Sequence, residues 1–227
     1  MEKCIDFKEG KLYITDDAER YASLREGGPA IFLEGDYKAP SGADYVIGTD
    51  ALSDTAYLHR AFCHMAGIPY VIAETERLII RESAPSDAPE LLRIYEEEKD
   101  AAFRSGGEEL SEDGLSAYIK NMYGFYGFGL FTVLSKESGH IIGRVGFSFE
   151  DDAGSPELGF IIEKSMRGRG YAYEAATAAI KYMRVELEID ELSARVSESN
   201  VASLKLLSRL NREYGINIII TKEEGSR

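Results

Sequence analysis

Residues 157–175 read ELGFIIEKSMRGRGYAYEA, an apolar run followed directly by a glycine-rich loop and an alanine-rich segment. The apolar run is typical of a strand, and the alanine-rich segment is typical of a helix. The first N–H groups of a helix have no partner inside the helix and carry a partial positive charge, so a glycine-rich loop there can wrap closely around a phosphate group. The stretch therefore predicts a strand, an anion-binding loop and a helix in succession.

The composition of the loop favours a phosphate ligand. Gly168 and Gly170 permit close backbone approach or a positive φ, and Arg167 and Arg169 can add charge-assisted hydrogen bonds to phosphate oxygens. The sequence does not contain the nucleotide-binding pattern G-x-x-x-x-G-K followed by Ser or Thr, and the dinucleotide pattern needs a small residue where Tyr173 stands. A glycine-rich turn without a ligand stays open as the plainer alternative.

Outward from the loop, residues 74–227 alternate between strand-like and helical runs. Strand-like runs are TERLIIRES, FGLFTVLS, HIIGRVGFSF, PELGFIIE, ELSARVS and INIIIT. Two helical runs lie between the first and second of these strands, one follows the glycine loop, and one spans about Val201 to Leu210. This order predicts an α+β fold, in which a mixed, mostly antiparallel central sheet is flanked by helices.

The glycine loop and a later segment of the chain resemble motifs of a known family. Arg167 to Ala172 match the R-x-x-G-x-A cofactor motif of the GNAT acetyltransferases, and Asn200 and Ser203 resemble the family's later N-x-x-S pattern. The similarity extends over about residues 74 to 212, and ELGF is most similar to the branch that contains the ribosomal-protein N-acetyltransferases. The resemblance implies the GNAT fold, acetyl-CoA as co-substrate without a metal, and these cofactor-binding residues: Phe160, Ile162, Arg167, Gly168, Arg169, Gly170, Tyr171, Ala172, Asn200 and Ser203.

The implied activity is transfer of an acetyl group to a primary amine, on a small molecule or on a protein N-terminus. A non-catalytic acyl-CoA-binding sensor is the alternative from another class, because Leu207 stands where many relatives carry a tyrosine as general acid. The family's L-G-F after this helix is replaced by Leu210-Asn211-Arg212, so we expect shortened or rearranged C-terminal strands. The sequence does not identify the acceptor. It does not determine the oligomeric state either, and a dimer is one of the open possibilities.

Candidate catalytic and acceptor-binding residues lie before the glycine loop. An attacking amine must lose a proton, and Glu157 at the start of the cofactor strand is the candidate base, ahead of the acidic turn at Glu150 to Asp152. A surface carboxylate without a role is the competing interpretation of Glu157. The string MYGFYGFGLF predicts an acceptor-pocket wall or ordinary core, and its candidate residues are Tyr123, Phe125, Tyr126 and Phe128.

Residues 1–73 are expected to form a separate, small α/β unit with a parallel sheet, followed by the GNAT domain at 74–227. LYITDD, IFLE and GADYVIGTDALS resemble the second half of a haloacid-dehalogenase-like domain. The nucleophile motif D-x-D-x-T/V of that family is missing here, which favours a non-catalytic binding or interface module. A hydrolase centred on Asp16 and Asp17 is the least favoured alternative.

Charge and cysteine content limit the partners. The 40 acidic and 26 basic side chains give a formal net charge of −14, which disfavours nucleic acid and anionic membranes and favours amine substrates. The only two cysteines, Cys4 and Cys63, are far apart, and the N-terminus lacks a signal-peptide core, so we expect a cytoplasmic protein. The scattered His59, His64 and His140 predict no metal site.

Overall fold

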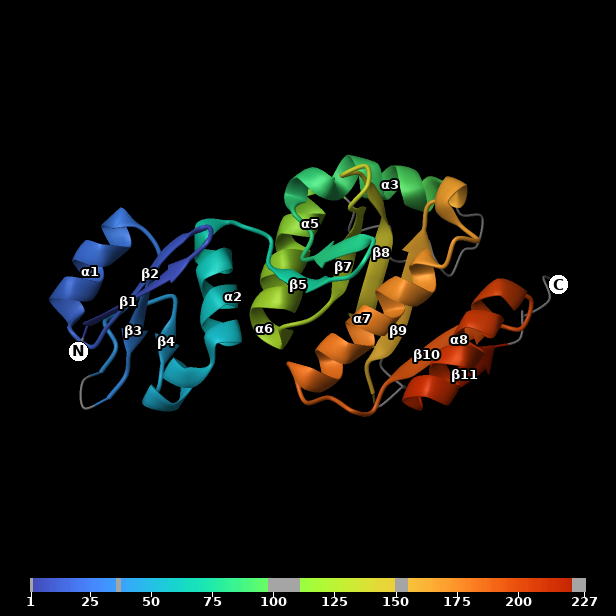
Figure 1. Cartoon of the computed structure of the whole chain (residues 1–227). Helices are drawn as coiled ribbons and strands as arrows, with labels where there is room; N and C mark the ends of the chain where they lie inside the picture. Colours follow the sequence, from blue (N-terminus) through green and yellow to red (C-terminus); the bar gives the residue numbers. More distant parts are fainter. Residues whose placement is uncertain (1, 36–37, 98–110, 150–154, 222–227) are drawn as a thin grey trace. The chain divides into compact units, whose positions relative to one another are not determined.

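The computed structural model describes residues 2–35, 38–97, 111–149 and 155–221. The chain divides into two compact units, Met1–Tyr70 and Val71–Arg227 (Figure 1). The sequence placed this boundary after residue 73. Strand β5 (Val71–Glu74) explains the difference, because it pairs antiparallel with β6 (Leu78–Arg81) and so belongs to the second unit.

The first unit is a four-stranded sheet with two helices. Its elements are β1 (Glu2–Phe7), β2 (Gly10–Thr15), α1 (Ala18–Gly27), β3 (Ala30–Leu33), β4 (Val46–Ile47), the 3₁₀ turn η1 (Thr49–Ser53) and α2 (Thr55–Ala66). The strands follow the order β1-β2-β3-β4, and β2, β3 and β4 are parallel as predicted. Strand β1 forms an antiparallel hairpin with β2, so the expectation of a purely parallel sheet is corrected. The sequence did not mark β1 because most of its residues are exposed and show no buried period.

The second unit carries a seven-stranded sheet in the order β11-β10-β9-β8-β7-β6-β5. Its further elements are η2 (Pro85–Asp87), α3 (Ala88–Glu96), α5 (Glu112–Tyr118), the π-helical turn η4 (Ile119–Tyr123), α6 (Gly124–Tyr126), β7 (Leu130–Ser135), β8 (Ile141–Ser148), β9 (Glu157–Ile162), η5 (Lys164–Met166), α7 (Tyr171–Val185), β10 (Ser193–Ser197), α8 (Val201–Tyr214) and β11 (Asn217–Thr221). Strands β5 to β9 are antiparallel neighbours, while β10 runs parallel to β9 and β11. The predicted mixed, mostly antiparallel sheet is confirmed.

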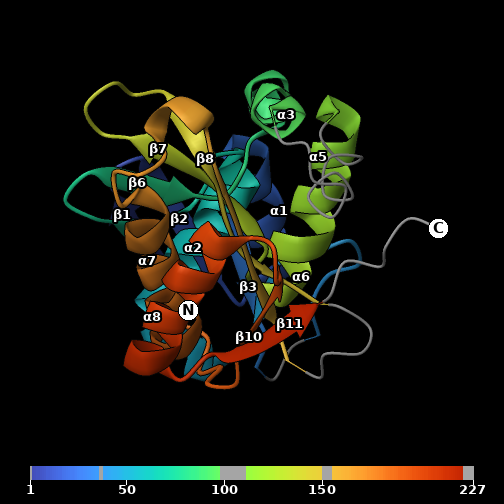
Figure 2. The ribbon, with the colours of Figure 1, turned by 90° about the vertical axis from the view of Figure 1, so that its right-hand side faces the viewer.

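Helices cover both faces of this sheet. Figure 2 shows α7 and α8 on one side and α3 with α5 on the other. Residues of α3 and α5 bury Ile161 of β9 in one apolar cluster, whereas α7 packs on β5, β6, β8 and β9. Successive side chains of a strand point to opposite faces, so Glu157, Gly159 and Ile161 share the α3–α5 face.

Strands β9 and β10 diverge after a single pair of residues. Glu157 pairs with Ser193 at the beginning of both strands, and no later pair joins them within the described residues. All six residues of β9 pair with β8, and all five residues of β10 pair with β11. The sheet therefore opens as a wedge toward the carboxyl ends of β9 and β10, from which the glycine loop and the segment before α8 continue.

A buried ion pair anchors the beginning of α3 to the sheet. The carboxylate of Asp87 accepts hydrogen bonds from both terminal nitrogens of Arg81, at 2.7 and 2.9 Å, and from Thr132 Oγ1 at 3.0 Å. Burial alone raises the pKa of Asp87, but the hydrogen bonds from Arg81 and from the Ala84 N–H outweigh it and hold this pKa below its usual value. Asp87 is therefore charged at neutral pH and fixes α3 against β6 and β7.

Candidate active site

A cavity of about 720 Å³ fills the wedge between β9 and β10. This volume lies within the range of small-molecule binding sites. The cavity is lined by the end of β9, the glycine loop with the first residues of α7, and the beginning of α8: Phe160, Ile161, Ile162, Met166, Arg167, Gly168, Gly170, Tyr171, Ala172, Tyr173, Ser199, Asn200, Val201, Ala202, Ser203 and Leu206. Of the ten residues that the resemblance implied for the cofactor, only Arg169 is missing from this lining.

The glycine loop leaves the N-terminus of α7 open to the cavity. Gly170 is the N-cap of α7 with φ +83°, and no side chain of the described chain caps this helix. Gly168 has φ +75°, and a Cβ added there would meet no atom within 4 Å. Glycine is thus required at 168 by backbone conformation rather than by crowding. The first N–H groups of α7 thus border the cavity without a side-chain cap, and anion binding there stays a prediction.

Two predicted cofactor residues have structural partners of their own. Arg167 Nε donates a hydrogen bond to the carbonyl of Ile162 at 2.7 Å, which joins the loop to the end of β9. Asn200 is the N-cap of α8, and its Oδ1 accepts from the N–H of Ser203 at 3.1 Å. Both side chains therefore shape the cavity wall, whatever contact they make with a ligand.

Glu157 lies outside the cavity lining, on the α3–α5 face of the sheet. Its Oε2 is 3.2 Å from Arg195 Nε, and the Glu157 side chain is 14 % exposed. Sequence reasoning missed Arg195, since only the pairing of β9 with β10 brings it next to Glu157. The alternative acidic turn, Glu150 to Asp152, lies outside the described residues.

The aromatic segment does not form one wall. Tyr123 and Phe128 are buried, whereas Phe125 is 80 % exposed and Tyr126 is 45 % exposed. The Tyr123 hydroxyl donates to the carbonyl of Leu130 at 2.6 Å, and burial raises the pKa of Tyr123. Tyr123 and Phe128 therefore fit the ordinary-core alternative, because the backbone turns both side chains into the core. Acceptor contact by the exposed Phe125 and Tyr126 stays a prediction.

One further aromatic residue joins the exposed part of this segment. Phe149 is 51 % exposed, and its ring centroid lies 5.2 Å from those of Tyr126 and Phe128. Phe149 directly follows Ser148, which pairs with Glu157. The exposed aromatic cluster of Phe125, Tyr126 and Phe149 thus lies near the beginning of β9. Sequence reasoning missed Phe149, which could have been noted as an aromatic residue immediately after an apolar strand.

Leu207, where many relatives carry tyrosine, is 2 % exposed and packs in the core. Among the described residues, no group of three or more His, Cys, Asp or Glu side chains could hold a metal ion. In the same part of the chain, no helix combines the length and apolar character needed to span a bilayer.

Comparison with known proteins gives a consistent result. The model of the acetyltransferase (GNAT) domain matches residues 77–211. The ribosomal protein uS5-alanine N-acetyltransferase of Escherichia coli is 30 % identical over 167 residues, 67 % of this chain and 83 % of that protein. An uncharacterized N-acetyltransferase p20 of Bacillus licheniformis is 33 % identical over 82 residues, 36 % of this chain but only 46 % of p20.

A solved structure agrees with the sequence relatives. An acetyltransferase from Agrobacterium tumefaciens is 26 % identical with a TM-score of 0.50, over 61 % of this chain and 81 % of that one. The family match begins at residue 77, and the resemblance of residues 1–73 to a haloacid-dehalogenase-like domain receives no support. The wedge, its glycine loop and these matches together show that this chain belongs to the GNAT acetyltransferase family and is an N-acetyltransferase of the GNAT type.

Proposed function

We propose that the chain binds acetyl-CoA with its pyrophosphate at the N–H groups of Arg167 to Ala172 and acetylates a primary amine. The observation that carries this proposal is the wedge cavity, which ends on the open N-terminus of α7. Phosphate oxygens fit such a site because partial positive charge and unpaired donors coincide there. The non-catalytic sensor is not favoured, since the relatives are named as N-acetyltransferases.

The diverging strands supply the second part of the proposed cofactor site. Beyond Glu157, the edge of β9 that faces β10 has no strand partner within the described residues. Its backbone groups at Phe160 and Ile162 are therefore proposed to pair with the pantetheine arm. Asn200 and Ser203 close the opposite wall of the same cavity.

The proposed chemistry is acyl transfer to nitrogen. Bound acetyl-CoA supplies the thioester. The amine nitrogen attacks its carbonyl carbon, a C–N bond forms, and the C–S bond breaks with release of the thiolate. Glu157, directly or through water, is proposed to accept the proton of the attacking ammonium. Leu207 offers no proton to the thiolate, so solvent or another hydroxyl group protonates it.

The acceptor is proposed to approach on the α3–α5 face. Glu157 lies on that face, and Phe125, Tyr126 and Phe149 lie near the beginning of its strand. A carboxylate with aromatic rings suits a cationic amine before it is deprotonated, and a net charge of −14 attracts such substrates. A small-molecule amine and a protein N-terminus both meet these requirements.

The two units of the chain are proposed to have different roles. Every proposed site residue lies in the second unit, while the first unit is proposed to be a non-catalytic binding or interface module. The two thiols, neither of them in a disulfide, support a cytoplasmic location. The formal net charge of −14 supports the absence of a nucleic-acid or membrane partner.

The test uses the full chain with acetyl-CoA and a panel of polyamines, amino acids and short peptides with free N-termini. We expect thiol release that depends on the acceptor, with a mass increase of one acetyl group on that acceptor. Calorimetry with CoA measures binding separately. CoA binding without thiol release from any acceptor would support the sensor instead.

A further inference from the structure

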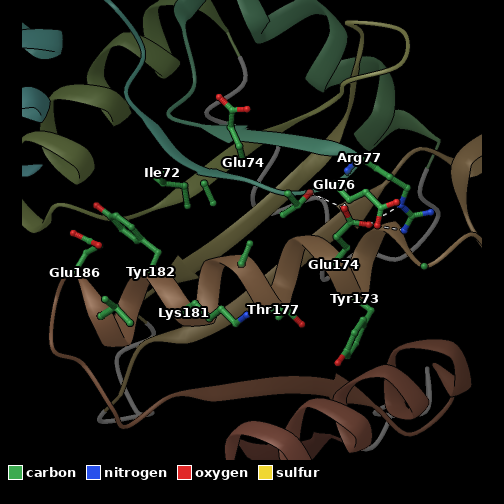
Figure 3. A pocket seen from close by; sticks show the side chains of 15 residues that line it. Ile72, Glu74, Glu76, Arg77, Tyr173, Glu174, Thr177, Lys181, Tyr182 and Glu186 are labelled. Carbon is green, nitrogen blue, oxygen red and sulfur yellow. Dashed lines mark hydrogen bonds and ion pairs between the residues drawn. The ribbon is translucent and has the colours of Figure 1, made fainter. Parts of the chain in front are cut away.

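The turn between β5 and β6 holds the first turn of α7 through one carboxylate. Glu174 Oε1 accepts hydrogen bonds from Thr75 Oγ1 at 2.6 Å and from the Arg77 N–H at 3.1 Å. Its Oε2 accepts from Arg77 Nε at 2.7 Å and lies 2.5 Å from Nη2 (Figure 3). This network connects residues about 100 positions apart in sequence and reaches the helix that begins at the glycine loop.

Arg77 also contacts the glycine loop itself. Its Nη1 donates a hydrogen bond to the carbonyl of Arg169 at 3.0 Å, and its guanidinium lies 4.3 Å from the centroid of the Tyr171 ring. One side chain therefore touches the residues on both sides of Gly170. An arginine can do this because its planar group carries donors in several directions and stacks on an aromatic face.

The carbonyl contact fixes the direction of an N–H group. The carbonyl of Arg169 and the N–H of Gly170 belong to one trans peptide unit, in which they point in opposite directions. Gly170 borders two cavities: the wedge cavity, and a second cavity of about 750 Å³ that Arg77 also lines. Since the carbonyl faces Arg77, the N–H of Gly170 points away from Arg77.

The charge of Glu174 indicates a second role for Arg77, which is to neutralise this carboxylate. Burial alone raises the pKa of Glu174, but hydrogen bonds from Thr75 and Arg77 outweigh it and keep this pKa below its ordinary value. Glu174 is therefore ionised at neutral pH, in the first turn of the helix that is proposed to hold the pyrophosphate. Without a nearby cation, its charge would repel the phosphate groups.

We infer that Arg77 is a positioning residue for acetyl-CoA, which orients the Arg169–Gly170 peptide toward the pyrophosphate and neutralises Glu174. This inference rests on the proposed function. Of the two cavities described, Arg77 lines the second and not the wedge cavity, so its effect on the cofactor passes through the loop. The inference gives a role to a residue that no glycine-loop motif includes.

The main experiment measures CoA binding by calorimetry for Arg77→Met and Arg77→Lys. We expect at least tenfold weaker binding for Arg77→Met. We expect a smaller loss of at least threefold for Arg77→Lys, which keeps the charge but cannot make the same bidentate contact with Glu174. Arg20→Met is the matched control, because Arg20 also pairs bidentately with a carboxylate, Glu2, and its side chain is 48 % exposed compared with 40 % for Arg77. It should bind CoA within twofold of the wild type.

Acetylpantetheine, which lacks the pyrophosphate, separates positioning from general damage. The kcat/KM for acetylpantetheine should be the same in wild type and Arg77→Met, while the KM for acetyl-CoA rises and kcat at saturation stays near the wild-type value. An equal loss with both substrates would overturn the inference. Wild-type CoA affinity in either Arg77 variant, folded by circular dichroism, would overturn it as well.

The double variant Arg77→Met with Glu174→Gln divides the two tasks. If Arg77 orients the peptide as well as neutralising Glu174, removing the carboxylate charge restores only part of the CoA affinity. Full restoration would overturn the orienting role. A wild-type chain that binds no CoA at all would instead contradict the proposed function, so the two failures are distinguishable.

Discussion

The glycine loop and the aromatic segment were both predicted from the sequence to be functional, but they differ in which part of the chain forms the structure, the backbone or the side chains. Residues 167 to 172 act through their backbone, with positive φ at Gly168 and Gly170 and an open helix N-terminus, and all but Arg169 line one cavity. The aromatic segment acts through its side chains, which are divided between the core and the surface. The comparison shows that a motif defined by backbone conformation is easier to predict than one defined by the direction of its side chains.

The local helix geometry explains the division. The π-helical turn η4 ends at Tyr123, and Gly127 with φ +73° ends α6. A residue on a regular helix is turned by about 100° from its neighbour, so an irregular turn redirects every following side chain. Because the sequence carries no mark of the π-turn, it could not separate Tyr123 from Phe125.

The largest expected effect comes from removing the core member of this segment. Tyr123 is 1 % exposed, stacks on Phe131 at 5.6 Å between centroids, and bonds the Leu130 carbonyl. Tyr123→Ala should lower the free energy of unfolding by about 3 to 5 kcal/mol, as for other buried aromatic residues. Chemical denaturation measures this loss. A change below about 1 kcal/mol would show that Tyr123 is not part of the core, and the contrast with Phe125 would disappear.

The sequence predicted most of the second unit because its strands and helices carry clear periodicity and the loop is local. It misplaced β5, whose run VIAE follows a helix of the first unit but pairs with β6. It also missed Arg77 and Arg195, because their partners Glu174 and Glu157 are 97 and 38 residues away in sequence. Such contacts are set by strand pairing and helix packing, which no local pattern records.

The second prediction concerns Glu157. This residue lies on β9, which leads to the glycine loop, and its side chain lies on the α3–α5 face of the sheet. Glu157→Gln keeps the shape of the side chain and removes the proposed base, so kcat should fall about 10²-fold while CoA affinity changes less than twofold. Steady-state kinetics and calorimetry measure the two quantities. Full activity near neutral pH would exclude Glu157 as the base and leave its pairing with Arg195 as a structural contact.

The third prediction tests the backbone side of the comparison. Gly170→Val should weaken CoA binding at least tenfold, because a β-branched residue disfavours φ +83° and its side chain would occupy the space proposed for the phosphate groups. The control is Gly42→Val in the first unit, at φ +84° with no atom within 4 Å of the added Cβ. Both variants strain the backbone, and only the first should change CoA affinity by calorimetry. Equal CoA affinity in the two folded variants would remove the loop from the site.

The smallest expected effect belongs to the exposed part of the aromatic segment. Because Phe125 is 80 % exposed, Phe125→Ala should change the free energy of unfolding by no more than about 0.5 kcal/mol. If this ring receives the cationic acceptor, its loss costs about 0.5 to 1 kcal/mol, which corresponds to a two- to fivefold higher KM for the acceptor. The KM for acetyl-CoA should stay constant, since the cavity lining does not include Phe125.

Val185→Ala on α7 serves as the control, because Val185 is also an exposed apolar residue, at 73 %. If both variants leave the acceptor KM unchanged, Phe125 is ordinary surface and makes no contact with the acceptor. If only Phe125→Ala raises it, one segment supplies both a core residue and a substrate contact three positions or fewer apart.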